Sequence, residues 1–144
     1  MKNTSKWNRA IAEGISLLFI VLFVYASITK LLDYEKFAVQ MGQSPMLTKW
    51  AEQLAWLVPT VELCTVGLLL FSNSKLVGLY VSVSLMVMFT VYIILASKFS
   101  DYVPCSCGGV LQNMTWDQHL VFNLFFVASG MVAVIRYPQQ QPTT

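Results

Sequence analysis

Four long apolar stretches dominate this chain and limit the folds it can adopt. Of its 144 residues, 56% are hydrophobic and 11% are charged, whereas roughly a quarter of an ordinary soluble domain is charged. A helix needs about 20 mainly apolar residues to cross a bilayer. Four stretches meet this length: residues 10–32, 54–71, 76–97 and 116–136. We therefore predict an all-α fold, an integral membrane four-helix bundle, formed as a single domain by residues 1–137.

The first apolar stretch also sets the expected orientation. Lys2, Lys6 and Arg9 precede it, as basic residues precede a signal peptide. The stretch is longer than the ~7–15 apolar residues of a signal peptide and ends without a small-residue cleavage pattern. We expect a retained first helix. Because basic residues favour the cytoplasmic side, we expect both termini there and the loop between the third and fourth spans outside.

The segments between the spans carry their own helix signals. Residues 34–41 place apolar side chains at i, i+3, i+4 and i+7, which predicts a short interfacial helix that ends near Gly42. Ser44 and Pro45 form a cap and first-turn pair, so we expect the next helix to begin near Pro45. Pro59 then falls inside that helix and should bend it.

The last span has the clearest start signal. Thr115 and Gln118 stand at capping-box spacing, and Asp117 suits the positive end of the helix dipole. We expect this helix to begin at about Trp116. Residues 138–144 have little to bury, and we expect a disordered tail.

Two cysteines in the loop before the last span are the first candidates for chemistry. Cys105 and Cys107 are separated by one residue and followed by Gly108 and Gly109, which permit a tight turn. A disulfide in so small a ring is strained, and strained exposed disulfides are the more oxidising ones. Metal binding and purely local packing are the alternatives, although structural zinc usually has four ligands. Cys64, in contrast, is expected to be a small buried side chain within its helix.

Ionisable residues inside the spans are the second signal, because each is costly in lipid and should face a partner. Glu62 lies about 12 Å into its apolar stretch, and Lys30 lies near the end of the first. Both belong to the outer half of the bundle, so we expect them to pair. A structural ion pair, or a Lys30 side chain that reaches the interface, is the alternative to a role in proton transfer.

The fourth span adds a histidine and an amide on one helix face. His119 and Asn123 are four residues apart, and the same face continues through Phe126 and Gly130. A histidine beside a thiol can assist proton transfer. The alternative is that both side chains only satisfy polar groups between helices.

Two further predictions follow from the charged residues. Glu13 lies four residues after Arg9, which predicts a surface ion pair within the first helix. The net charge of +2 is small and its basic residues are dispersed, so we do not expect nucleic-acid binding.

Three segments together resemble a known family. Residues 25–33 (YASITKLLD), residues 58–63 (VPTVEL) and the CSCGG loop at residues 105–109, before a helix with His119 and Asn123, resemble the MauE/DoxX-type redox-associated membrane proteins. The loop makes the MauE-like branch the better match. The resemblance implies a four-helix bundle in the bacterial inner membrane that exchanges electrons between extracytoplasmic thiols and a membrane carrier such as quinone. It also implies a thioredoxin-like or other envelope protein partner.

The leading hypothesis is therefore a thiol-disulfide redox protein. Cys105 and Cys107 would change redox state, while His119 and Glu62 would handle protons. The residues expected to hold the carrier are Lys30, Asn123 and Trp116. Quinone-linked disulfide generators use a second, relaying cysteine pair that this chain lacks, so a partner should supply it. The alternatives are a non-enzymatic accessory subunit of an envelope complex, whose cysteine pair is structural, and a small-solute transporter.

Overall fold

Every regular element in the described part of the chain is a helix. A computed structural model describes residues 2–43, 47–99 and 114–137. The elements are α1 (Lys2–Leu32), α2 (Tyr34–Gly42), a single 3-10 turn η1 (Thr48–Trp50), α3 (Ala51–Leu70), α4 (Lys75–Phe99) and α5 (Trp116–Arg136). The predicted all-α fold is confirmed. The tail at residues 138–144 lies outside the described residues.

Four of the helices are long and apolar enough to cross a membrane. They are Thr4–Leu32, Thr48–Leu70, Lys75–Lys98 and Trp116–Arg136, which correspond to the four predicted spans. Helix α1 begins at Lys2, earlier than the start of its apolar stretch. No proline or glycine interrupts residues 2–10, so the helix continues beyond the apolar part with polar residues.

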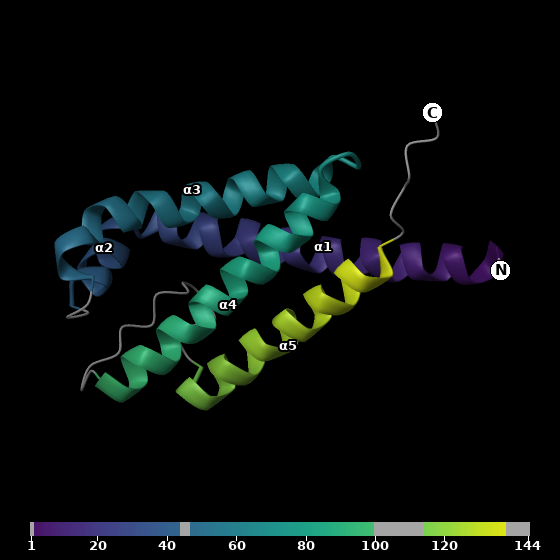
Figure 1. The fold of residues 1–144 in the computed structure, drawn as a ribbon. Coiled ribbons are helices and arrows are strands. Elements are labelled where there is room, and N and C mark those ends of the chain that lie inside the picture. The colour runs from purple at the N-terminus through teal and green to yellow at the C-terminus, as the bar shows by residue number, and fades with distance from the viewer. Residues whose placement is uncertain (1, 44–46, 100–113, 138–144) are drawn as a thin grey trace.

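The helices run alternately up and down, so that one end of the bundle collects both chain ends (Figure 1). The start of α1, the turn between α3 and α4, and the end of α5 lie at this terminal end. The opposite end holds the end of α1, α2, the start of α3, the end of α4 and the start of α5. The two helices that flank Cys105 and Cys107 in the sequence, α4 and α5, therefore have their adjoining ends opposite the terminal end.

Aromatic side chains fill the centre of the bundle. Phe19 and Phe23 of α1 have ring centroids 5.8 Å apart, and Phe126 of α5 meets Phe19 edge-on at 5.4 Å. Gly130 permits this approach of the helices, since an added Cβ would lie 2.5 Å from Val83 Cγ2 and 3.1 Å from the Phe19 ring. The core thus depends on one small residue where α5 crosses α1 and α4.

Helix α2 packs on the first turns of α3. Phe37, Met41 and Ala55 are buried together, which confirms the apolar stripe predicted for residues 34–41. The predicted helix start near Pro45 lies outside the described residues, and regular structure resumes with η1 at Thr48. Pro59 lies inside α3, as expected.

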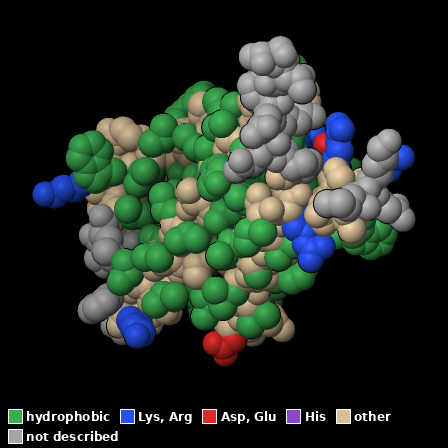
Figure 2. Space-filling view, turned by 45° about the vertical axis from the view of Figure 1, so that its right-hand side comes forward, with side chains coloured by type: hydrophobic (Ala, Val, Ile, Leu, Met, Phe, Trp, Pro, Cys, Tyr) green, Lys and Arg blue, Asp and Glu red, His purple; other side chains and the backbone are tan. Residues whose placement is uncertain are grey.

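The outer surface is apolar, as a lipid-facing surface should be. Leu17, Val21, Leu70 and Ile135 are among the large hydrophobic side chains that are exposed. Figure 2 shows hydrophobic side chains across the visible face, with Lys and Arg side chains near its two ends. Soluble proteins rarely expose so extensive an apolar surface, whereas a bilayer would cover it.

Two sequence expectations are wrong. Cys64 is exposed on α3 and is not buried, because a lipid-facing position accepts a small apolar side chain as readily as a core does. Glu13 pairs with Lys75 of α4, at 2.5 Å between Oε2 and Nζ, in place of the expected Arg9. The pair joins two helices at the terminal end, whereas spacing within α1 could suggest only a local partner.

Candidate functional site

An ion pair between α1 and α3 forms the centre of the candidate site. Lys30 occupies the last turn of α1, and Glu62 lies in the middle of α3. Lys30 Nζ lies 2.5 Å from Glu62 Oε1, and the two side chains are 5% and 1% exposed. The expected contact between these two residues is therefore present, and it is inside the bundle.

The second carboxylate oxygen of Glu62 also has a donor from α1. Ser27 Oγ donates to Glu62 Oε2 at 2.9 Å. Ser27 and Lys30 are three residues apart and thus share one face of α1, so both oxygens of the carboxylate are held from the same helix. Hydrogen bonds to an ionised group are about twice as strong as neutral ones. The arrangement therefore fixes the position of the carboxylate.

Two aromatic rings flank the ammonium group of Lys30. Its Nζ lies 5.4 Å from the ring centroid of Phe89 in α4 and 5.8 Å from that of Phe37 in α2. Both distances are within the ~6 Å range of a cation–π contact. A single lysine thus contacts residues of α2, α3 and α4. Sequence reasoning missed Ser27, Phe37 and Phe89 as members of the site, although the spacing of Ser27 from Lys30 could have indicated the first.

Helix α5 contributes the remaining polar groups. Its start is fixed by the predicted capping box, in which Thr115 Oγ1 accepts from Gln118 N and Gln118 Oε1 accepts from Thr115 N. His119 and Asn123 follow in the first two turns and are 2% and 3% exposed. Among the described residues, Asn123 Nδ2 has no hydrogen-bond partner. A buried amide without a partner is costly. A further hydrogen-bond acceptor next to Asn123 Nδ2 would therefore be favourable.

A cavity brings these side chains together. Lys30, Glu62, His119 and Asn123 line one space of about 30 Å³ between α1, α3, α4 and α5. The rest of its lining is apolar: Leu22, Phe23, Ala26, Met86, Phe89 and Phe122. A volume of this size holds about one water molecule. Four of the predicted site residues therefore share one small, mostly apolar enclosure.

The cavity does not fit a quinone in this conformation. Sites for organic ligands enclose about 300–1,000 Å³, at least about ten times the volume found between these helices. Trp116, which was predicted to help hold the carrier, lies in the first turn of α5 and does not line the cavity. The enclosure fits a water molecule or a proton path better than it fits a bound ring.

The cysteine pair was predicted in the connection between α4 and α5. Cys105 and Cys107 lie outside the described residues. The helices that this connection joins end at Phe99 and begin at Trp116, and His119 follows within one turn of the second. Lys30 in the last turn of α1 and His119 in the first turn of α5 therefore belong to the end of the bundle where α4 ends and α5 begins (Figure 1).

Charged and polar groups inside a membrane bundle indicate function more often than they do in soluble proteins. Each is costly in lipid, faces the interior and pairs with another polar group. The ion pair satisfies its own members, and it can be explained by helix association alone. His119 and Asn123 add polar groups that this pair does not require, which favours a role beyond holding α1 against α3.

Comparison with known proteins gives one match. A family described as "Methylamine utilisation protein MauE" matches residues 8–136. The match covers all four membrane-spanning helices and the segment with the cysteine pair. No curated protein and no solved structure matches the chain.

Proposed function

The chain belongs to the MauE family of membrane proteins, and from this premise we propose that it is the membrane component of an envelope thiol-disulfide exchange system. Family membership itself suggests a membrane accessory role. The proposal adds the chemistry: Cys105 and Cys107 exchange a disulfide with a thioredoxin-like partner in the envelope. It also places the chain in the bacterial inner membrane, with both termini in the cytoplasm.

The buried cavity is the observation that carries the proposal. Lys30, Glu62, His119 and Asn123 meet inside the bundle, in the half where α4 ends and α5 begins (Figure 1), and the two cysteines lie between these helices in the sequence. A purely structural bundle has no need of four polar side chains around a space for one water molecule, because apolar residues would fill it at lower cost. The positions of these groups suit proton exchange with the thiols.

The proposed exchange needs no oxidant other than the disulfide itself. A thiolate of the partner attacks one sulfur of the Cys105–Cys107 disulfide, the S–S bond breaks, and a mixed disulfide forms. The second thiolate of the partner then attacks the mixed disulfide and releases the reduced chain. Two electrons and two protons pass from the partner to this chain, and the reverse reaction oxidises the partner.

Protons must move with the electrons, and the cavity supplies groups for this task. Histidine is the side chain best suited to take up and return a proton near neutral pH, and His119 lies closest in sequence to the cysteines. Glu62 is held by two donors, so it stabilises a positive charge in the cavity. Asn123 can orient a water molecule between such groups through its amide nitrogen, which has no hydrogen-bond partner in the part of the chain that the structure describes.

Quinone, the expected membrane carrier, has no step in this proposal. The cavity is too small to receive it, and the residues around the cavity are held by the Lys30–Glu62 pair. We therefore limit the proposal to reversible exchange: the two electrons that the partner dithiol gives to the Cys105–Cys107 disulfide return to the partner disulfide in the reverse reaction. A partner with its own dithiol also supplies the second cysteine pair that a complete relay requires.

Trapping of a mixed disulfide tests the proposal. In a Cys64→Ser background, Cys105→Ser and Cys107→Ser each leave one thiol in the loop. One of them should accumulate as a disulfide-linked adduct with an envelope protein, which non-reducing gels and mass spectrometry of native membranes would identify. The Cys64→Ser variant alone, with the pair intact, should show little adduct.

Two outcomes would contradict it. The exchange proposal fails if neither single variant forms an adduct under oxidising or reducing conditions. Full function of the Cys105→Ser/Cys107→Ser double variant, with a partner that still co-purifies in fixed ratio, would instead identify a non-enzymatic accessory subunit.

A further inference from the structure

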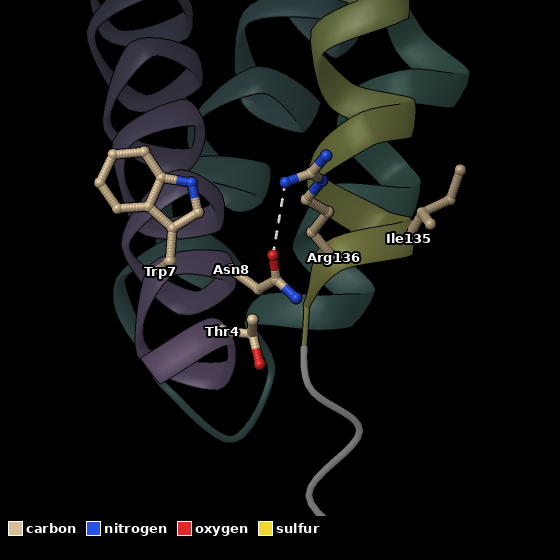
Figure 3. A pocket seen from close by; sticks show the side chains of 5 residues that line it. All are labelled: Thr4, Trp7, Asn8, Ile135 and Arg136. Atoms are coloured by element: carbon tan, nitrogen blue, oxygen red, sulfur yellow. Dashed lines mark hydrogen bonds between the residues drawn. The ribbon is translucent and has the colours of Figure 1, made fainter. Parts of the chain in front are cut away.

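A second hollow lies at the terminal end of the bundle, far from the polar cavity. It is a cleft of about 650 Å³ lined by Thr4, Trp7 and Asn8 of α1 and by Ile135 and Arg136 of α5. Figure 3 shows Arg136 reaching from the last turn of α5 toward Asn8 on the first turns of α1. The volume is within the ~300–1,000 Å³ range of small-ligand sites.

Arg136 has most of its hydrogen-bonding capacity left. Its Nη1 donates to Asn8 Oδ1 at 3.4 Å, which is longer than the usual ~2.9 Å of such bonds. A guanidinium has five N–H donors, and no carboxylate within the described residues is paired with Arg136. The guanidinium is therefore available to a bidentate anion such as a phosphate.

The charge around the cleft is positive. The nearby acid Glu13 is already paired with Lys75. Lys6 and Arg9 lie in the same turns of α1 but do not line the cleft, so they add only a diffuse positive charge at this end. Three cations at the end of two membrane-spanning helices complement an anion held at headgroup level.

The apolar part of the cleft indicates that the anion carries acyl chains. Trp7 is 68% exposed and Ile135 is 79% exposed, and both lie at the ends of helices that span the membrane. Tryptophan at this level has its ring near acyl chains and its N–H near headgroups. A soluble phosphate would contact the guanidinium but would leave these side chains uncovered.

We propose that the cleft between α1 and α5 is a binding site for one anionic phospholipid, whose phosphate contacts Arg136 and whose two acyl chains lie against Trp7 on one flank and Ile135 on the other (Figure 3). The site is separate from the proposed thiol exchange, and neither depends on the other. It predicts that the terminal end of the bundle lies in a leaflet rich in anionic lipid.

Native mass spectrometry of the full chain tests the site. The protein is placed in bilayers of equal phosphatidylglycerol and phosphatidylcholine with identical acyl chains, extracted in mild detergent and weighed with its retained lipid. We expect the wild type to retain phosphatidylglycerol at least about fivefold more than phosphatidylcholine. Arg136→Gln should bring the two to about equal retention. Arg9→Gln removes the same charge from the same end but not from the cleft lining, and it should leave most of the preference.

Several results would overturn the proposal. Equal retention of both lipids by the wild type would show that the cleft has no preference for an anionic lipid. An equal loss of lipid preference in Arg136→Gln and Arg9→Gln would show diffuse attraction to the surface in place of a site. Displacement of the lipid by millimolar inorganic phosphate would indicate a site for a free anion. A change in dimer fraction without a change in lipid would indicate a second copy of the chain. Arg136→Lys controls for misfolding of Arg136→Gln. It keeps the charge but loses the bidentate geometry, so it should retain part of the preference for phosphatidylglycerol.

Discussion

Removal of the Glu62 carboxylate should destabilise the bundle more than any other single polar change within the described residues. Glu62→Gln keeps the size of the side chain but leaves the Lys30 ammonium without its counter-ion. Lys30 is 5% exposed, so bulk water cannot replace the carboxylate, and the adjoining cavity holds only about one water molecule. Loss of one partner from a buried pair costs about 3–5 kcal/mol, because the remaining charge is uncompensated. The rings of Phe37 and Phe89 contact the ammonium group in the wild type and in the variant alike, so they do not reduce this cost. The water-sized cavity beside Lys30 favours the lower half of the range.

A double-mutant cycle separates the pair from its surroundings. Glu62→Gln, Lys30→Met and the double variant are purified as full chains in detergent and unfolded with increasing sodium dodecyl sulfate, with helix content followed by circular dichroism. Each single variant should lose about 3 kcal/mol. The double variant should lose at least about 2 kcal/mol less than the sum of the two, because no charge is then left alone.

Two results would refute this reasoning. A loss below about 1 kcal/mol in Glu62→Gln is the size expected for a solvent-exposed pair, and it would show that the lysine finds water or another partner. Additive losses in the double variant would show that Lys30 and Glu62 do not stabilise each other, whatever their distance.

Three further changes follow from the same structure, each measured by the same unfolding assay. Ser27→Ala removes a hydrogen bond to the Glu62 carboxylate and should lower the free energy of unfolding by about 1.5–3 kcal/mol. Ser84→Ala, on the exposed face of α4, should leave it almost unchanged. Equal losses in the two variants would contradict the hydrogen bond assigned to Ser27. Gly130→Ala forces a Cβ into a contact of 2.5 Å and should cost about 1–3 kcal/mol, whereas Gly14→Ala meets nothing within 4 Å and should be neutral or stabilising. Asn123→Leu replaces an amide nitrogen that lacks a partner within the described residues. It should leave the free energy of unfolding unchanged or raise it, while thiol exchange becomes slower. A large loss of stability would show that the amide does have a hydrogen-bond partner.

The features that the sequence predicted are those with a strong local or energetic signature. Apolar stretches of spanning length predicted four helices, and the capping box at Thr115 predicted the start of α5 to within a residue. The Lys30–Glu62 pair could be predicted because each charge is costly in lipid and both lie in the same half of the membrane. The face shared by His119 and Asn123 followed from helical spacing.

The features that it missed depend on how helices face one another. Ser27 is an ordinary serine in a helix until α3 brings the Glu62 carboxylate within reach. The partner of Glu13 is Lys75, 62 positions away, and no spacing rule within α1 could identify it. The position of Cys64 was missed for a second reason. The exterior of a membrane protein is apolar as well as its core, so a small apolar side chain does not indicate whether the residue is buried.

Alkylation of native membranes tests most directly whether Cys105 and Cys107 change redox state. Membranes are treated with a thiol-alkylating reagent before and after reduction, and the mass of the full chain is compared. We predict that the wild type shows a population in which two thiols become accessible only after reduction, and that His119→Leu slows its recovery of the disulfide when reductant is removed. A pair that keeps one state under every redox condition would contradict the account.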